Sequence, residues 1–151
     1  MSCTYNSKIS AGFSQSVMEG ANGDASTVEM LLSQGARVDV RDGGEDTPTL
    51  NAAFFGHTQV CELLLAIGKA DIEETRTGGG RTSLFQAAAE GNASTVEMLL
   101  SQGARVDVTD DHCPGLFMPL LAAAKRVHDK VCKLLFTWDL NMHQEKKDCP
   151  W

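Results

Sequence analysis

Apolar residues recur at helical spacing along the chain, in short segments separated by polar, glycine-containing connections. In the segment ASTVEMLLSQGARVDV at residues 25–40, Val28, Leu31 and Leu32 fall on one face of a predicted helix. The same letters occur again at residues 93–108. A helix of this length cannot bury its apolar face alone, so the pattern predicts several short helices that pack against related copies of themselves.

Related segments lie between and after these two copies. GHTQVCELLLAIGKADIE at 56–73 aligns with GNASTVEMLLSQGARVDV at 91–108, and VHDKVCKLLFTW at 127–138 supplies a fourth outer segment. The second, third and fourth outer segments each follow an Ala-rich helical segment. These inner segments are TPTLNAAFFGH (47–57), TSLFQAAAEGN (82–92) and MPLLAAAKRVH (118–128). We therefore predict an N-terminal tail (1–13), a repeat domain (14–140) with units at about 14–46, 47–81, 82–117 and 118–140, and a C-terminal tail (141–151).

These segments resemble the ankyrin-repeat family, whose unit opens with Thr-Pro-Leu-His, continues with Ala-Ala-x-x-Gly-His and ends with Gly-Ala-Asp-Val-Asn. The resemblance implies an all-α repeat solenoid of stacked helix-turn-helix units joined by short β-hairpin loops. The first unit departs from the pattern with SVMEGANGD, and the fourth has Met118 in place of Thr and Val127 in place of Gly. Terminal units of a solenoid are often atypical because one side has no neighbour.

Local signals predict where the helices begin and end. Ser26 with Glu29, and Ser94 with Glu97, fit capping boxes, although the preceding Asp24 or Asn92 could cap instead. The left-handed residue that ends an outer helix is predicted at Gly35, Gly68 and Gly103, with Lys69 inserted after the second of these. Trp138 and Leu140 are predicted to fold back as an end cap.

Composition restricts the partners. Thirteen basic and twenty acidic residues give a net charge of −7, which argues against binding to a nucleic-acid backbone. We find no apolar run long enough for a transmembrane helix and no apolar core of a signal peptide at the N-terminus. We therefore expect a monomer that binds no nucleic acid and no membrane, in the cytoplasm, with the nucleus left open.

Catalytic motifs are not evident. The sequence contains no GxSxG, HExxH or phosphate-binding loop, and Gly78-Gly79-Gly80 is typical of a turn. We predict a non-enzymatic protein with no cofactor and with free cysteines. His128 and Cys132, with His112-Cys113, could be imagined as a zinc site, but His128 and Cys132 take positions that His57 and Cys61 also take, so metal binding is a remote alternative. The sequon Asn92-Ala93-Ser94 is expected to stay unmodified.

The resemblance also implies where a partner would bind, because ankyrin stacks usually contact partners through hairpin tips and the exposed face of the inner helices. Phe54 and Phe55 stand at positions expected to be solvated, so we predict that they anchor a partner, with Lys125 and Arg126 adding electrostatic selection. The alternative is that one or both phenylalanines pack against the next unit. The predicted protein-binding residues are Gly44, Glu45, Asp46, Phe54, Phe55, Arg81, Glu90, Lys125 and Arg126.

The predicted function is a protein–protein interaction module that acts as an adaptor, scaffold or inhibitor. The alternative is a segment of a larger ankyrin-containing scaffold or of a ligase substrate receptor. The residues do not choose between them, because such stacks bind many unrelated partners.

Overall fold

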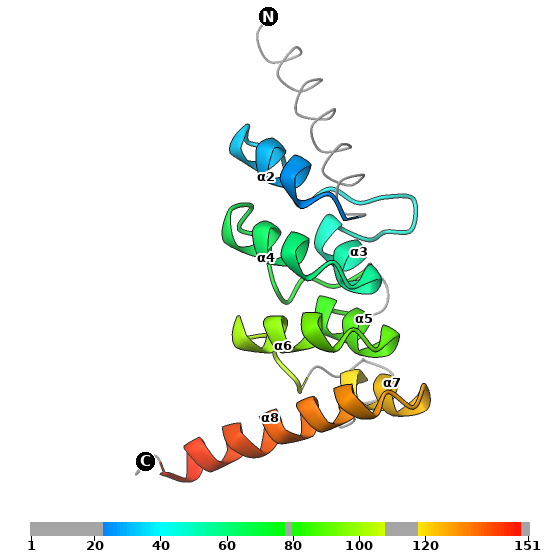
Figure 1. Ribbon diagram of the computed structural model, residues 1–151, viewed down its shortest axis with the longest axis vertical. Helices are drawn as coiled ribbons and strands as arrows, with labels where there is room; N and C mark the ends of the chain where they lie inside the picture. Colours follow the sequence, from blue (N-terminus) through cyan, green and yellow to red (C-terminus); the bar gives the residue numbers. More distant parts are fainter. Residues whose placement is uncertain (1–22, 78–79, 108–117, 149–151) are drawn as a thin grey trace, which may run out of the picture.

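The computed structural model describes residues 23–77, 80–107 and 118–148, and these ranges contain seven helices (Figure 1). The outer helices are α2 (Ala25–Ser33), α4 (Thr58–Ala66), α6 (Ala93–Ser101) and α8 (Asp129–Asp148); the inner helices are α3 (Pro48–Phe55), α5 (Ser83–Glu90) and α7 (Met118–Lys125). No strand occurs within these ranges. The connections turn back through isolated backbone hydrogen bonds, among them those from the Asp42 N–H to the Asp46 carbonyl and from the Arg76 N–H to the Arg81 carbonyl, and the described residues form no β-ladder.

The inner helices begin and end at residue types that favour helix boundaries. The side chains of Thr47 and Thr82 accept hydrogen bonds from the third backbone N–H after them and so cap α3 and α5. Both helices end at a glycine in the left-handed region, Gly56 (φ 77°) and Gly91 (φ 76°). These eight-residue helices are therefore bounded by local chemistry at both ends.

The predicted capping boxes of the outer helices are wrong. Asp24 caps α2 by accepting from the backbone N–H of Thr27 at 3.2 Å, so Ser26 lies inside the helix. Helix α6 likewise begins before Ser94, but the residue at its cap position, Asn92, makes no capping hydrogen bond. The Nδ2 of Asn92 instead donates to the carbonyls of Ala53 (3.0 Å) and Phe54 (2.9 Å) in the preceding unit.

The helix-ending glycines were predicted correctly at two of three positions. Gly35 (φ 83°) and Gly103 (φ 90°) are left-handed, whereas in the second unit this conformation falls on the inserted Lys69 (φ 52°). Gly68 is required for another reason: a Cβ there would lie 2.6 Å from Cγ1 of Val38 and 2.7 Å from the carbonyl oxygen of Leu64. The insertion moves the left-handed residue by one and leaves Gly68 at a close approach between units.

The helices stack in two rows (Figure 1). Each inner helix packs on the next inner helix, each outer helix packs on the next outer helix, and α3, α5 and α7 each pair with the outer helix that follows. One continuous set of buried apolar side chains runs through the stack from Val28 to Leu135. The fold is thus an all-α repeat solenoid, as the sequence predicts.

In each described unit that has a successor, a glycine lies against the residue just before the outer helix of the following unit. A Cβ at Gly23 would lie 3.0 Å from the His57 ring, and a Cβ at Gly56 would lie 2.8 Å from the Asn92 side chain. At Gly91 the corresponding distance, to Nδ1 of His128, would be 2.6 Å. Glycine suits these positions because a Cβ about 3 Å or less from a side-chain atom of the next unit would collide with it.

The last unit ends differently from the prediction. Helix α8 continues without a break through Trp138 and Leu140 to Asp148, so these two residues do not fold back as an end cap. Trp138 is partly buried against the core, but Leu140 is 54% exposed. The predicted boundary between residues 140 and 141 lies within this helix. None of the described helices combines the length and apolar character needed to cross a bilayer.

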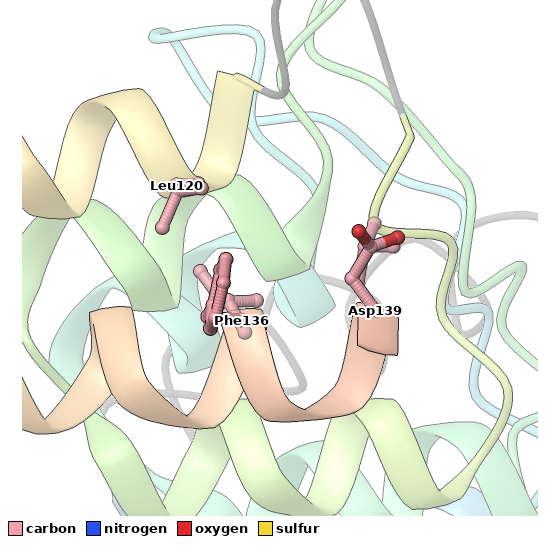
Figure 2. Close-up of a pocket in the computed structure, with 5 residues that line it drawn as sticks. Leu120, Phe136 and Asp139 are labelled. Carbon is pink, nitrogen blue, oxygen red and sulfur yellow. The ribbon is translucent and has the colours of Figure 1, made fainter. Parts of the chain in front are cut away.

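A small apolar cavity of about 110 Å³ lies at this end of the stack, between the last two helices (Figure 2). Leu120 of α7 points toward Phe136 of α8, and Asp139 lies about one turn further along α8. Val106 and Leu135 complete the lining. The cavity has room for only a few atoms, and its lining is apolar apart from Asp139, so it offers no set of convergent polar groups.

Candidate protein-binding groove

A broad open groove of about 340 Å³ runs across the exposed side of the three inner helices, and we call it the inner-helix groove. Its apolar lining comes from all three inner helices, with an aromatic ring from each of the first two. Most of its polar and charged lining residues lie at or next to the helix ends. The lining residues are Phe54, Arg81, Phe85, Gln86, Ala89, Glu90, Met118, Leu121, Ala122, Lys125 and Arg126.

Two aromatic rings, those of Phe54 and Phe85, form much of the apolar surface of the groove. Phe54 stands near the end of α3 and is 39% exposed. Phe85 lies in the first turn of α5, and the guanidinium carbon of Arg81 lies 5.5 Å from the centre of its ring, a cation–π arrangement. Arg81 is therefore held over an apolar surface while its side chain remains exposed.

The far end of the groove is cationic. Arg126, just after α7, donates to the Ala89 carbonyl at 3.2 Å and to the Glu90 carboxylate, which fixes it against the preceding unit. Lys125 is exposed and makes no ion pair with a described residue. The lining thus contains three cations and one carboxylate in a chain whose net charge is −7.

The second predicted anchor, Phe55, lies beside the groove rather than in its lining. It is 56% exposed, its ring stacks on the His57 imidazole at 6.1 Å, and it meets the Phe54 ring edge-on at 5.0 Å. Neither ring is fully buried by the next unit, since Phe54 is 39% and Phe55 is 56% exposed. The two phenylalanines form an exposed aromatic pair at one margin of the groove.

The predicted tip residues form a separate, self-bonded loop. Oδ1 of Asp42 accepts from the backbone N–H groups of Gly44 (2.8 Å) and Asp46 (3.0 Å), and Arg41 donates to the Glu45 carbonyl at 2.8 Å. The hydrogen bond from Asn51 holds the pKa of Asp42 below its ordinary value. The loop is therefore ordered by its own chemistry, and its residues do not line the groove.

This first tip is also linked to the second tip, which is the connection between α4 and α5. Asp46 lies 3.8 Å from Nε of Arg76, and Arg41 lies 3.4 Å from the Glu74 carboxylate. Burial raises the pKa of both Asp46 and Glu74, and the nearby arginines oppose that shift. These two ion pairs join the first tip to the second and offset the charges of Asp46 and Glu74.

The structure therefore brings five of the nine predicted residues into one groove, and the three larger apolar residues among those that the sequence analysis missed are Phe85, Met118 and Leu121. Phe85 and Leu121 align with the buried Leu50, and Met118 takes the position of the capping Thr47 and Thr82, so the repeat pattern assigns all three to structural roles. The available signal was size, because Phe at a Leu position and Met at a Thr position extend further than the repeat requires.

The Cys and His residues considered for chemistry have structural surroundings. Nε2 of His128 donates to the Ala89 carbonyl at 3.1 Å. Cys61 is fully buried, and burial raises the pKa of its thiol to about 12, so almost none of it is thiolate near neutral pH. In the described parts of the chain, no three His, Cys, Asp or Glu side chains are grouped so as to hold a metal ion. His112 and Cys113 lie outside the described residues.

The two-row stack and the groove on its inner helices define a helical-repeat protein. A family model for ankyrin repeats, in three copies, matches residues 15–110, which is more than half of the chain. The chain belongs to the ankyrin-repeat family. It is therefore a protein–protein interaction module, from a family of modules that bind partners rather than catalyse reactions.

Relatives with curated names are similar over part of the chain. The human transient receptor potential cation channel subfamily A member 1 is 34% identical over 85 residues, 54% of this chain and 7% of that protein. The probable 26S proteasome regulatory subunit p28 of Saccharomyces cerevisiae is 32% identical over 84 residues, 55% of this chain and 36% of that protein. The zinc finger CCCH domain-containing protein 24 of Oryza sativa subsp. japonica is 39% identical over 67 residues, 42% of this chain and 9% of that protein. The matched region spans from 7% to 36% of each relative's length.

Proposed function

We propose that this chain is a non-enzymatic docking module, serving as an adaptor, scaffold or inhibitor, that binds one protein partner in the inner-helix groove. The observation that supports the proposal most directly is that residues from three successive units, Phe54, Arg81 and Lys125 among them, line one open groove. Such a surface combines exposed aromatic rings with charges at its margin, the composition that is enriched in protein interfaces.

The rigidity of the surface supports the same function. Phe54 lies on a capped helix, Arg81 is stacked on Phe85, and Arg126 is bonded to the preceding unit. Groups that are already ordered lose little conformational entropy when a partner binds, so a larger share of the contact energy becomes affinity.

Affinity capture with a Phe54→Ala, Phe55→Ala double variant tests the proposal. Neither side chain is in the buried core, so the variant should keep the helical circular dichroism of the wild type. Removing both exposed rings should weaken capture of the partner by about 2 kcal/mol or more, because exposed aromatics are frequent interface hot spots.

A Phe136→Ala variant is the matched control. Phe136 is also an exposed aromatic side chain, at 59%, but it stands on α8 and does not line the groove. Proteins captured by the wild type and the control, and lost with the double variant, would be the partners. Equal capture by all three chains would refute the proposed function.

A further inference from the structure

We propose that the segment bound in the inner-helix groove carries an apolar side chain between two carboxylates. This inference rests on the proposed function, since it names the chemistry of the partner for the same groove. It follows from three properties of the groove: the sign of its charge, the position of the cations and the apolar surface between them.

The groove has a charge opposite to that of the chain as a whole. Arg81, Lys125 and Arg126 outnumber the single carboxylate of Glu90 in its lining, whereas the complete chain has a net charge of −7. Charges further than about 8 Å away are largely screened at physiological salt, so a bound segment interacts mainly with the local cations. Local charge therefore favours an acidic segment in spite of the acidic molecule around it.

The cations stand near opposite ends of the inner helices. Arg81 comes just before the capping residue of α5, and Lys125 is the last residue of α7, which packs beside α5. Because each helix has eight residues and rises about 1.5 Å per residue, the two positions are roughly 12 Å apart along the helix direction. Arg81 and Lys125 can thus engage two separate carboxylates on one segment.

The separation predicts a spacing in the partner. An extended segment rises about 3.3 Å per residue, so its two carboxylates would stand about three to five residues apart. Between them, the groove offers Phe54, Phe85 and Leu121, which suit one large apolar side chain. Arg126 is already bonded to Glu90, so its main contribution is to hold the cationic end in place.

A nucleic acid is the less favourable occupant. Its backbone carries one negative charge for every phosphate and needs a continuous track of cations, whereas here an apolar surface and the Glu90 carboxylate interrupt the positive charge. A peptide that alternates acidic and apolar residues matches the lining at each point.

Selection from a random twelve-residue peptide display library, with the full chain as bait, tests this chemistry. The enriched peptides should share Leu, Ile, Phe, Met or Trp with Asp or Glu on both sides, at the spacing given above. A synthetic peptide of that consensus should lose at least tenfold in affinity when its acidic residues are replaced by Lys, or when its apolar residue is replaced by Ala.

Charge reversal of the groove is the decisive step. The variants Arg81→Glu and Lys125→Glu should each weaken the acidic peptide at least tenfold and improve binding of its Lys-substituted form. Lys133→Glu is the matched control, because Lys133 is also exposed but stands on α8 outside the groove lining, and it should change the affinity less than twofold.

The outcomes separate this inference from the proposed function. Peptides that need Phe54 but have a neutral or basic consensus would overturn the inference and leave the docking function standing. Acidic peptides whose affinity is unchanged by both Phe54→Ala and Lys125→Glu would also overturn the inference, since they would bind outside the groove. A library that yields no groove-dependent peptide, or a single-stranded oligonucleotide that competes as strongly as the peptide, would also overturn it. The capture experiment decides the docking function separately.

Discussion

Gly91, in an interior unit, and Val127, in the last described unit, occupy aligned positions with the same backbone but different neighbours. Both are left-handed, with φ of 76° and 60°. At Gly91 the His128 ring of the next unit lies so close that any side chain would collide, whereas Val127 is 76% exposed. The turn therefore requires the left-handed conformation, while the following unit requires the absence of a side chain.

The same contrast appears at the apolar positions that face the next unit. Ala88 is fully buried and Leu100 is 2% exposed, but the aligned residues of the last unit, Ala124 and Phe136, are exposed. No described segment packs over that face of the last unit. Burial in a solenoid thus comes from the neighbouring unit, and an identical position changes its role when the neighbour is missing.

The largest effect should come from truncating the aligned apolar pair. Leu100→Ala should lower the free energy of unfolding by about 2–5 kcal/mol, because it leaves a cavity between two units. Phe136→Ala should lower it by less than about 1 kcal/mol, because more than half of that side chain is already in water. Urea denaturation followed by circular dichroism measures both values, and similar losses would mean that α8 is covered in solution.

The next effect concerns the aligned left-handed positions. Gly91→Val should cost about 2–4 kcal/mol, from the strain of a left-handed β-branched residue and the collision with His128. Val127→Gly should instead stabilise the chain by about 0.5–1 kcal/mol, because it relieves the same strain where no contact is lost. Thermal melting of both variants checks the opposite signs. A destabilised Val127→Gly chain would show that the valine side chain makes a contact that the exposure does not reveal.

The smallest effect should come from the polar residues that bond one unit to the preceding one. Asn92→Ala removes two hydrogen bonds to main-chain carbonyls of α3 and should cost about 1–2 kcal/mol. His128→Ala removes one such bond, to Ala89, and should cost about 0.5–1 kcal/mol. The exposed Asn141 of α8 provides a control, since Asn141→Ala should be neutral. A greater loss for His128→Ala than for Asn92→Ala would indicate that the last unit is held as firmly as the interior ones.

Much of the fold could be predicted because its signals are local. Helical spacing locates the helix pairs, the Thr residues before α3 and α5 cap them, and Gly56 and Gly91 end them through the conformations open to glycine. Repetition of these signals at nearly equal intervals indicates a stack. Phe54, Lys125 and Arg126 could also be proposed as binding residues, since the family resemblance places them at variable inner-helix positions that are expected to be solvated.

The rest depends on contacts between residues about one repeat apart, which no local pattern encodes. Stacking turns Asn92 from a capping residue into a bond between units, and it leaves Phe85 in the groove although its aligned counterpart Leu50 is buried. It also joins Arg81, which precedes α5, and Lys125, at the end of α7, on the surface of one groove. Side-chain chemistry along the chain defines each unit, but the register and spacing of neighbouring units decide which side chains meet, because burial and charge depend on what lies next to them in space.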